Sequence, residues 1–355
     1  MVYMKSVLKI GDHIYTQSFQ YFASSYLMGF PQREQYLLEH VKDIKFSFFR
    51  HKVLSNISDV LRERERLNKY LKNKRFDYLM VDNPFSGLII DQDIKIPILF
   101  DCIDWYDEMY LKEFGVDRRY YLLRYGLLDL IKRAKKVVAQ SPIMLEVLNS
   151  WGLTTKETVV IPNGYDARIF YPYSRSKIIK LKTRFEKKHN LKLRGKKIIV
   201  YTGKLGVWYD NIKTISKAID KNQIFFIVGD GPILKEIPDQ TNIIKCGAVK
   251  ASEVPDYTNI ADVLVFPVDV DCSPIVISEY LAVGKPIVMG RGRMEWLLKD
   301  GKSGCMVDNN VYAWRLGINK ALKMKTQCKI NNLKLAEDLS WQKLSKKFSS
   351  FLNEE

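Results

Sequence analysis

The segment from Asp271 to Pro286 combines residue types that could hold a diphosphate. Ser273 and Pro274 are typical of a helix start, since a serine hydroxyl can cap the first turn and proline suits the first helical position. The free amides at this helix start would carry partial positive charge and favour phosphate groups. Glu279 follows about one and a half turns later in an otherwise apolar stretch, where its carboxylate could accept both hydroxyls of a ribose. The alternative is that Glu279 is a surface carboxylate.

Three other loops of the second half follow predicted strands. Gly203 would let the backbone approach a phosphate closely, and Lys204 would supply a cation. Gly229 begins a tight turn, and the backbone near Val249 could pair with the edge of a nucleobase. Ligands of parallel sheets bind at the carboxyl ends of the strands, so we expect these loops to converge with the Ser273 segment. Taken singly, each is also an ordinary turn signal.

Short apolar runs alternate with helix-like stretches along the whole chain, which is typical of α/β domains with parallel sheets. The runs that we predict to be strands are Ser6–Ile10, Tyr78–Val81, Ile96–Phe100, Lys136–Ala139, Lys197–Tyr201, Ile224–Val228, Ile243–Lys245, Val263–Phe266 and Pro286–Met289. A helix is predicted from Asp117, its possible cap, to Lys132.

The length of 355 residues suits two domains. A turn signal at Ile161–Gly164 and the basic stretch after it place the boundary near residues 165–195. We predict an N-terminal domain over residues 1–170 and a C-terminal domain over 171–339. A last helix over 340–355 carries Trp341, Leu344 and Phe348 at helical spacing.

The composition does not favour a metalloprotein, a membrane-spanning protein or a disulfide-stabilised protein. The five cysteines are scattered and form no CxxC pair, which fits a reducing cytosol and argues against a zinc site. The four histidines are isolated, so we expect no metal. No apolar run approaches the roughly 20 residues of a membrane span, and we identify no signal peptide.

The formal net charge of +17 is concentrated in two stretches, Leu61–Arg75 and Ser174–Lys197. Such charge attracts polyanions, namely anionic lipid headgroups, nucleic acid or diphosphate substrates. The alternative for either stretch is a lysine-rich solvated surface.

Several motifs of the second half stand in the order found in a known family. They are IPNGYDARIF (161–170), YTGKL (201–205), VGDGP (228–232), GAVKASEVPDYTNIADVLVFP (247–267) and SPIVISEYLAVGKPIV (273–288). With them the chain resembles the retaining GT-B glycosyltransferases, specifically the family-4-like group. The resemblance implies two Rossmann-like domains with an interdomain cleft, and a C-terminal helix that returns to the N-terminal domain.

The resemblance also implies roles for residues of the donor domain. Glu279 would bind the donor ribose, and Asp271, eight positions earlier, would contact the transferred sugar, although the family usually has a Glu there. The loop Ser273–Ile275 would hold the diphosphate, with Val249 near the base. Lys204 stands where an Arg is common and would stabilise the leaving diphosphate. A second basic residue often follows a few positions later. Here the chain reads Val-Trp-Tyr-Asp, so the set of basic residues that would bind the diphosphate is partly altered.

The first half matches the family more weakly. The loop Asp101–Asp107 looks like the one that often carries a His or an acid near the reacting sugar. Asp104 is our candidate there, and the alternative is that it caps a helix. On the acceptor side we expect a sugar contact from His13 and a lining residue in Arg33.

The sequence thus predicts transfer of a sugar, with retention, from a UDP- or GDP-sugar to an acceptor hydroxyl, with no metal or cofactor required. The acceptor would be a glycan or lipid-linked intermediate of cell-surface polysaccharide or glycolipid synthesis. The protein would be cytoplasmic, with its basic first half on the anionic inner face of the membrane. Two alternatives stay open. One is a glycosyltransferase that acts on modified DNA bases, as the high pI permits. The other is a catalytically inactive protein that binds sugar nucleotides.

Overall fold

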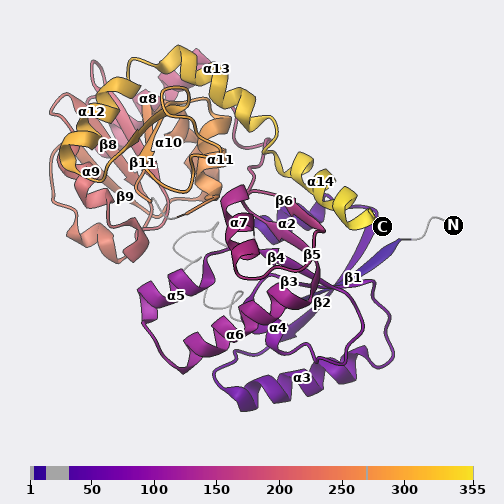
Figure 1. Ribbon diagram of the computed structural model, residues 1–355. Helices are drawn as coiled ribbons and strands as arrows, with labels where there is room; N and C mark the ends of the chain where they lie inside the picture. Colours follow the sequence, from indigo (N-terminus) through magenta and orange to yellow (C-terminus); the bar gives the residue numbers. More distant parts are fainter. Residues whose placement is uncertain (1–3, 13–31, 269–270, 355) are drawn as a thin grey trace. The chain divides into compact units, whose positions relative to one another are not determined.

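The computed structural model describes residues 4–12, 32–268 and 271–354 (Figure 1). Two six-stranded sheets form, with the strand orders β2-β1-β3-β4-β5-β6 and β12-β11-β10-β7-β8-β9. All neighbouring strands in them run parallel. The predicted α/β class with parallel sheets is confirmed. No described helix is both long and apolar enough to cross a membrane.

The first compact unit holds the first sheet and reaches to Pro162. Its strands are β1 (Lys5–Asp12), β2 (Ile44–His51), β3 (Tyr78–Val81), β4 (Ile98–Cys102), β5 (Ala134–Ala139) and β6 (Thr158–Val160). Its helices are α2 (Gln32–Glu39), α3 (Ile57–Leu71), α4 (Pro84–Leu88), α5 (Tyr106–Phe114), α6 (Arg118–Arg133) and α7 (Pro142–Ser150). Asp117 caps α6 as expected, because its carboxylate accepts a hydrogen bond from the amide of Tyr120.

Residues from Gln342 onward rejoin the first unit through α14 (Trp341–Asn353). Two lysines at the amino ends of strands hold the last turn of this helix. Lys5 Nζ donates to the carbonyl of Leu352 at 2.7 Å, and Lys136 Nζ donates to the carbonyls of Phe351 and Glu354 at 2.9 and 3.0 Å. Cations at a helix C-terminus satisfy its free carbonyls and complement its dipole. The predicted returning helix is therefore present.

The second compact unit spans Asn163–Trp341. Its strands are β7 (Lys197–Thr202), β8 (Gln223–Val228), β9 (Ile243–Gly247), β10 (Val263–Phe266), β11 (Ile287–Gly290) and β12 (Gly304–Val307). Its helices are α8 (Arg175–His189), α9 (Ile212–Ala218), α10 (Val254–Ile260), α11 (Ile275–Ala282), α12 (Val311–Ala321) and α13 (Lys325–Ala336), with 3-10 turns at Val207–Tyr209, Pro232–Glu236 and Ala251–Glu253.

Alternate residues of the second sheet build two cores, one on each face. Val200 and Phe226 join a core with α8, α10 and α11, whereas Ile199 and Phe225 join a core with α9 and α12. A strand buried on both faces reads as a continuous apolar run, which is why these strands were visible in the sequence. Gly284, with a φ of +68°, follows the C-cap Val283 and ends the helix α11.

Candidate functional site

The start of α11 lies beyond the carboxyl end of β10 and has open amides. The helix begins at Ile275 with Pro274 as its N-cap, and no side chain caps it. The amides of Ile275 and Val276 therefore have no carbonyl of their own helix to bond. We had expected Ser273 to cap this end, and that was wrong: its hydroxyl instead accepts a hydrogen bond from the amide of Asn163 at 2.8 Å.

Asn163 fixes the segment that leads into α11. Its side-chain amide donates to the carbonyl of Ser273 at 2.7 Å, and its own carbonyl accepts from the hydroxyl of Ser278 at 2.6 Å. Trp296 adds a second anchor, because its indole N–H donates to the carbonyl of Cys272 at 2.9 Å. These bonds hold the helix start in place without covering its amides. From the sequence we interpreted Asn163 only as a turn residue, and no sequence pattern marked Trp296 as part of the site.

Glu279 is buried on α11, with 7% of its surface exposed. Among the described residues, its carboxylate forms no hydrogen bond and no ion pair. Burial raises the pKa of Glu279 to about 8, since the ionised form has lost its water. The alternative that Glu279 is a surface carboxylate is wrong. A carboxylate buried without a partner suits a ligand that brings its own donors.

Tyr280, the next residue, ties α11 to the end of β7. Its hydroxyl accepts a hydrogen bond from the amide of Thr202 at 2.8 Å and lies 3.2 Å from the Thr202 hydroxyl. Burial raises the pKa of Tyr280 above its usual value. Gly203 and Lys204 follow Thr202 directly, so the loop that carries Lys204 is positioned by the same helix that carries Glu279. The Lys204 side chain is partly exposed.

Gly229 lets the loops after β7 and β8 pack backbone against backbone. Its φ is +148°, and a Cβ there would lie 1.8 Å from the carbonyl oxygen of Gly203. Its amide donates to the carbonyl of Gly247 at 2.9 Å. Val249 follows in the loop after β9 and packs, half-buried, against the core on the α11 face. Gly203, Gly229 and Val249 thus belong to the loops after β7, β8 and β9, which are neighbouring strands of the sheet.

Asp271 precedes this helix start and is partly exposed. Its Oδ1 accepts a hydrogen bond from the amide of Ser273 at 3.0 Å. Burial raises the pKa of Asp271 above its ordinary value, although the hydrogen bonds from the Ser273 and Cys272 amides oppose this shift. The carboxylate therefore shapes the loop that leads to the open amides of α11.

In the first unit, the guanidinium of Arg33 donates its hydrogen bonds to other groups of the protein. Its Nη2 and Nε donate to the two carboxylate oxygens of Asp101 at 2.9 and 3.1 Å, and its Nη1 donates to the carbonyl of Pro162 at 3.1 Å. With 6% of its surface exposed, Arg33 braces the carboxyl end of β4 and the end of this unit. His13, our other residue on the acceptor side, lies outside the described residues.

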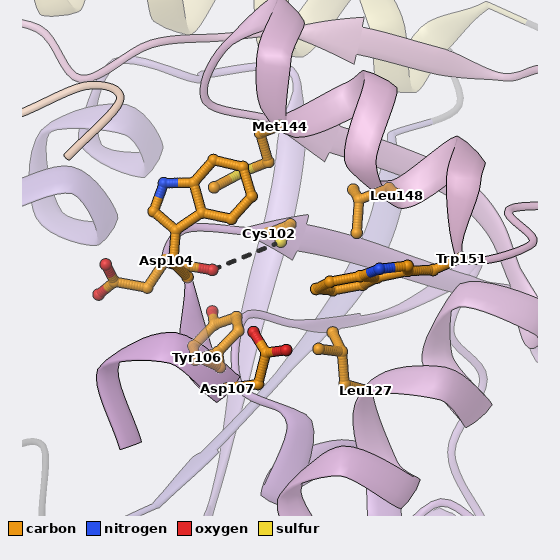
Figure 2. Close-up of a pocket in the computed structure, with 9 residues that line it drawn as sticks. Cys102, Asp104, Tyr106, Asp107, Leu127, Met144, Leu148 and Trp151 are labelled. Carbon is orange, nitrogen blue, oxygen red and sulfur yellow. Dashed lines mark hydrogen bonds between the residues drawn. The ribbon is translucent and has the colours of Figure 1, made fainter. Parts of the chain in front are cut away.

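Asp104 lies in the loop between β4 and α5, beside a small pocket (Figure 2). The N-cap of α5 is Trp105, and no side chain caps that helix, so the alternative that Asp104 is its cap is wrong. Figure 2 shows the Asp107 carboxylate turned toward the pocket and that of Asp104 turned away from its centre. Asp107 pairs with Arg124 at 2.6 Å, and the Arg124 guanidinium lies 4.5 Å from the ring centre of Trp151. Asp107, Arg124 and Trp151 had not stood out as site residues in the sequence.

No cluster of three or more His, Cys, Asp or Glu that could bind a metal occurs among the residues the structure describes. All five cysteines are free thiols. Burial raises the pKa of Cys246 to about 11, which keeps that thiol protonated.

Two glycosyltransferase families match the sequence. Residues 23–168 match Glycosyltransferase Family 4, and residues 196–323 match Glycosyl transferases group 1. The two matches together cover more than two thirds of the chain. No curated protein sequence is similar enough to match.

Several solved structures share the fold along almost their whole length. Sucrose-phosphate synthase from Thermosynechococcus elongatus superposes with a TM-score of 0.77 at 14% identity, over 98% of each chain. HepE from Anabaena, in complex with UDP-glucose, superposes with a TM-score of 0.71 at 15% identity, over 98% of this chain and 99% of that one. WaaG, a glycosyltransferase of lipopolysaccharide biosynthesis, superposes with a TM-score of 0.65 at 14% identity, over 99% of this chain and 100% of that one. The family matches, together with two parallel α/β units and a returning helix, show that this chain belongs to the family-4-like glycosyltransferases of the GT-B fold.

Proposed function

We propose that this protein transfers a hexose from a nucleotide diphosphate sugar, UDP- or GDP-linked, to an acceptor hydroxyl with retention of the anomeric configuration. The observation that carries the proposal is the uncapped start of α11 with Glu279 buried one turn behind it. Open amides suit a diphosphate, and a carboxylate without a partner suits a ribose. The structural neighbour HepE, solved with UDP-glucose, supports a sugar nucleotide as the donor.

The amides of Ile275 and Val276 and the ammonium of Lys204 stabilise the charge that develops on the leaving diphosphate. Because this charge grows as the anomeric bond breaks, these groups bind the transition state more strongly than the ground state. Asp271 contacts the transferred sugar. The oxygen of the acceptor hydroxyl bonds to the anomeric carbon from the face that the diphosphate leaves, and its proton passes to an oxygen of the departing diphosphate. The configuration is therefore retained, with Asp104 near the reacting sugar. His13 and Arg33 belong to the acceptor side, Arg33 as a brace of the β4 loop. The acceptor belongs to the predicted N-terminal domain (1–170), whose compact unit reaches to Pro162, and the donor to the predicted C-terminal domain (171–339), whose compact unit spans Asn163–Trp341. The returning helix was predicted over 340–355.

A thermal-shift screen of UDP-, GDP-, CMP- and dTDP-sugars identifies the donor, because a ligand of the folded state raises the melting temperature. With that donor, Glu279→Ala raises KM sharply, and Lys204→Ala mainly lowers kcat. NMR of the product reads the anomeric configuration. Normal transfer by both variants would refute the site assignment.

The proposed acceptor is a glycan or lipid-linked intermediate of cell-surface polysaccharide or glycolipid synthesis, used by a cytoplasmic enzyme on the inner face of the membrane. The net charge of +17 supports an anionic surface as a partner. A neighbour of lipopolysaccharide biosynthesis, WaaG, shares the fold.

The alternative acceptor, a modified base in DNA, draws on the same net charge. Binding to anionic vesicles against binding to duplex DNA, each across a salt series, separates the two acceptors. Turnover of the donor separates both from an inactive protein that only binds sugar nucleotides.

A further inference from the structure

Exposed apolar side chains gather on α5, on α6 and on the loop between them. Of the fourteen large hydrophobic residues exposed in the described chain, five lie in this one stretch of fifteen residues. We call them the α5–α6 face: Leu111, Phe114, Val116, Tyr121 and Tyr125, four of which are 62–65% exposed. Scattered exposed hydrophobics are ordinary, whereas a group of this kind marks an interaction surface.

Ring contacts join the two helices of this face. Tyr110 lies 5.0 Å from Phe114 and 6.2 Å from Tyr120, measured between ring centres, and Tyr120 lies 5.8 Å from Tyr121. The hydroxyl of Tyr110 also donates to Asp117, which caps α6. These contacts connect the exposed rings of Phe114 and Tyr121 through Tyr110 and Tyr120, and Tyr125 lies one turn along α6 from Tyr121.

The fold already has its own core beneath these helices. Leu123, Leu127 and Leu130 form the buried side of α6, and Tyr106 and Tyr110 form that of α5. Tyr121 and Tyr125 are one turn apart on the opposite side of α6. The exposed residues are thus not part of this unit's core.

Basic residues occur along the same segment as the α5–α6 face. The stretch Leu111–Arg133 contains six Lys or Arg and three acids. Asp117 caps α6, Asp129 pairs with Arg133 at 2.8 Å, and Arg124 pairs with Asp107 of α5 at 2.6 Å. Arg118 and Lys132 form no ion pair with any residue that the structure describes. The surface therefore offers cations and apolar rings together.

We propose that the α5–α6 face docks this enzyme onto an anionic lipid bilayer, with Phe114, Val116 and the two tyrosines in the interface and the basic side chains on the headgroups. Tyrosine and phenylalanine beside Lys and Arg match the layered chemistry of a bilayer surface. Residues of α5 and α6 also line the pocket beside Asp104 (Figure 2). Docking would thus place that loop near a lipid-linked acceptor, and this part of the inference rests on the proposed function.

The other basic helix makes a natural comparison. α8 carries more Lys and Arg than the α5–α6 face, but Ile179 is its only exposed large hydrophobic residue among those described. Binding through α8 would be purely electrostatic and would vanish at high salt. Binding through the α5–α6 face has an apolar part that salt does not remove.

Co-sedimentation with vesicles tests the assignment. The full-length protein is mixed with phosphatidylcholine vesicles, with or without about 30% phosphatidylglycerol, at low salt and at about 0.5 M NaCl. The combined variant Phe114→Ser, Tyr121→Ser, Tyr125→Ser removes the three exposed rings of the face, and Arg118→Gln with Lys132→Gln removes its two cations without an ion pair. The matched controls are Ile179→Ser with Tyr312→Ser for exposed apolar residues, and Lys180→Gln with Lys187→Gln for charge.

We expect the combined apolar variant to lower the partition coefficient at least about tenfold at both salt concentrations, with both controls within about twofold of wild type. The charge variant on the α5–α6 face should lose binding mainly at low salt. Equal binding by the apolar variant and wild type would overturn the inference. So would a shift from dimer to monomer in that variant during sedimentation in the absence of vesicles, since this would identify a second copy as the occupant.

The donor thermal shift of the same variants keeps this test separate from the proposed function. A variant that loses vesicle binding but keeps the normal thermal shift with the donor supports docking through the α5–α6 face, independently of the proposed function. Normal donor binding and transfer in a protein that never binds vesicles would refute docking and leave the transferase proposal intact.

Discussion

Donor binding should strengthen as the pH rises through the pKa of Glu279. Ribose hydroxyls donate hydrogen bonds, and the ionised carboxylate can accept both of them, whereas the protonated acid competes with its own O–H. Without ligand, burial holds the pKa of Glu279 at about 8. At neutral pH the protein must therefore release a proton before the donor is bound in full.

The size of the effect follows from the ionised fraction. With a pKa of about 8, about one carboxyl in eleven is ionised at pH 7 and about ten in eleven at pH 9. The apparent Kd equals the intrinsic Kd divided by the competent fraction. We therefore expect the Kd of an intact nucleotide sugar to fall about tenfold between pH 7 and pH 9, which is about 1.4 kcal/mol of binding free energy.

Isothermal titration calorimetry at constant ionic strength measures this dependence. An intact nucleotide sugar is used because its diphosphate diester does not titrate in this range. At pH 7, buffers of different ionisation enthalpy should report release of about 0.9 proton per donor bound. The control is Glu279→Gln, which cannot ionise and should bind weakly with a flat profile. A flat profile in wild type, or the same slope in both proteins, would contradict the assignment of Glu279 to the ribose.

Three further changes test the framework of the site and the fold. Gly229→Ala should abolish the donor thermal shift and lower the melting temperature by several degrees, because its Cβ would overlap the Gly203 carbonyl at 1.8 Å. Asn163→Ala should raise the donor KM with little change in melting temperature, because it removes the side-chain hydrogen bond to Ser273 and keeps the backbone one; an unchanged KM would contradict this. Lys136→Ala should lower the free energy of unfolding by about 3 kcal/mol in urea, since Lys136 is buried and bonds Glu157 and two helix carbonyls. Lys135→Ala is its control. Lys135 pairs with the same Glu157 from the solvent, so we expect no measurable loss.

Most of the predicted strands are buried on both faces, although β9 was predicted with partly exposed residues and β12 was missed despite its burial. Tyr78–Val81 and Val263–Phe266 were predicted with the bounds that the structure has. β2 was missed, since it lies at the edge of its sheet and Lys45 and Ser47 interrupt its apolar residues. α8 was also missed as a helix, because its lysines and arginines outnumber the two residues, Leu181 and Phe185, that it buries. Continuous burial leaves a signal in the sequence, whereas one-sided burial at an edge leaves a weaker one.

The donor loops were predictable because each follows a strand, and the carboxyl ends of parallel strands all lie on the same side of the sheet. The bonds that fix these loops were not. Asn163 meets Ser273 across 110 positions of sequence, and Thr202 meets Tyr280 across 78. Nothing local in the chain marks such pairs. The same holds for Arg33 and Asp101. Arg33 looked available for a ligand in the sequence, but its guanidinium is hydrogen-bonded to the distant Asp101.

The lysine contacts of α14 have a consequence for the order in which the protein can fold during synthesis. Lys5 lies in β1, yet its carbonyl partner, Leu352, is made 347 residues later. The buried ammonium of Lys136 likewise waits for Phe351 and Glu354. Residues Asn163–Trp341, in contrast, are contiguous and hold all six strands of the second sheet. The second sheet can therefore form before the first unit is complete, and the first unit stays open to chaperones until α14 has been made.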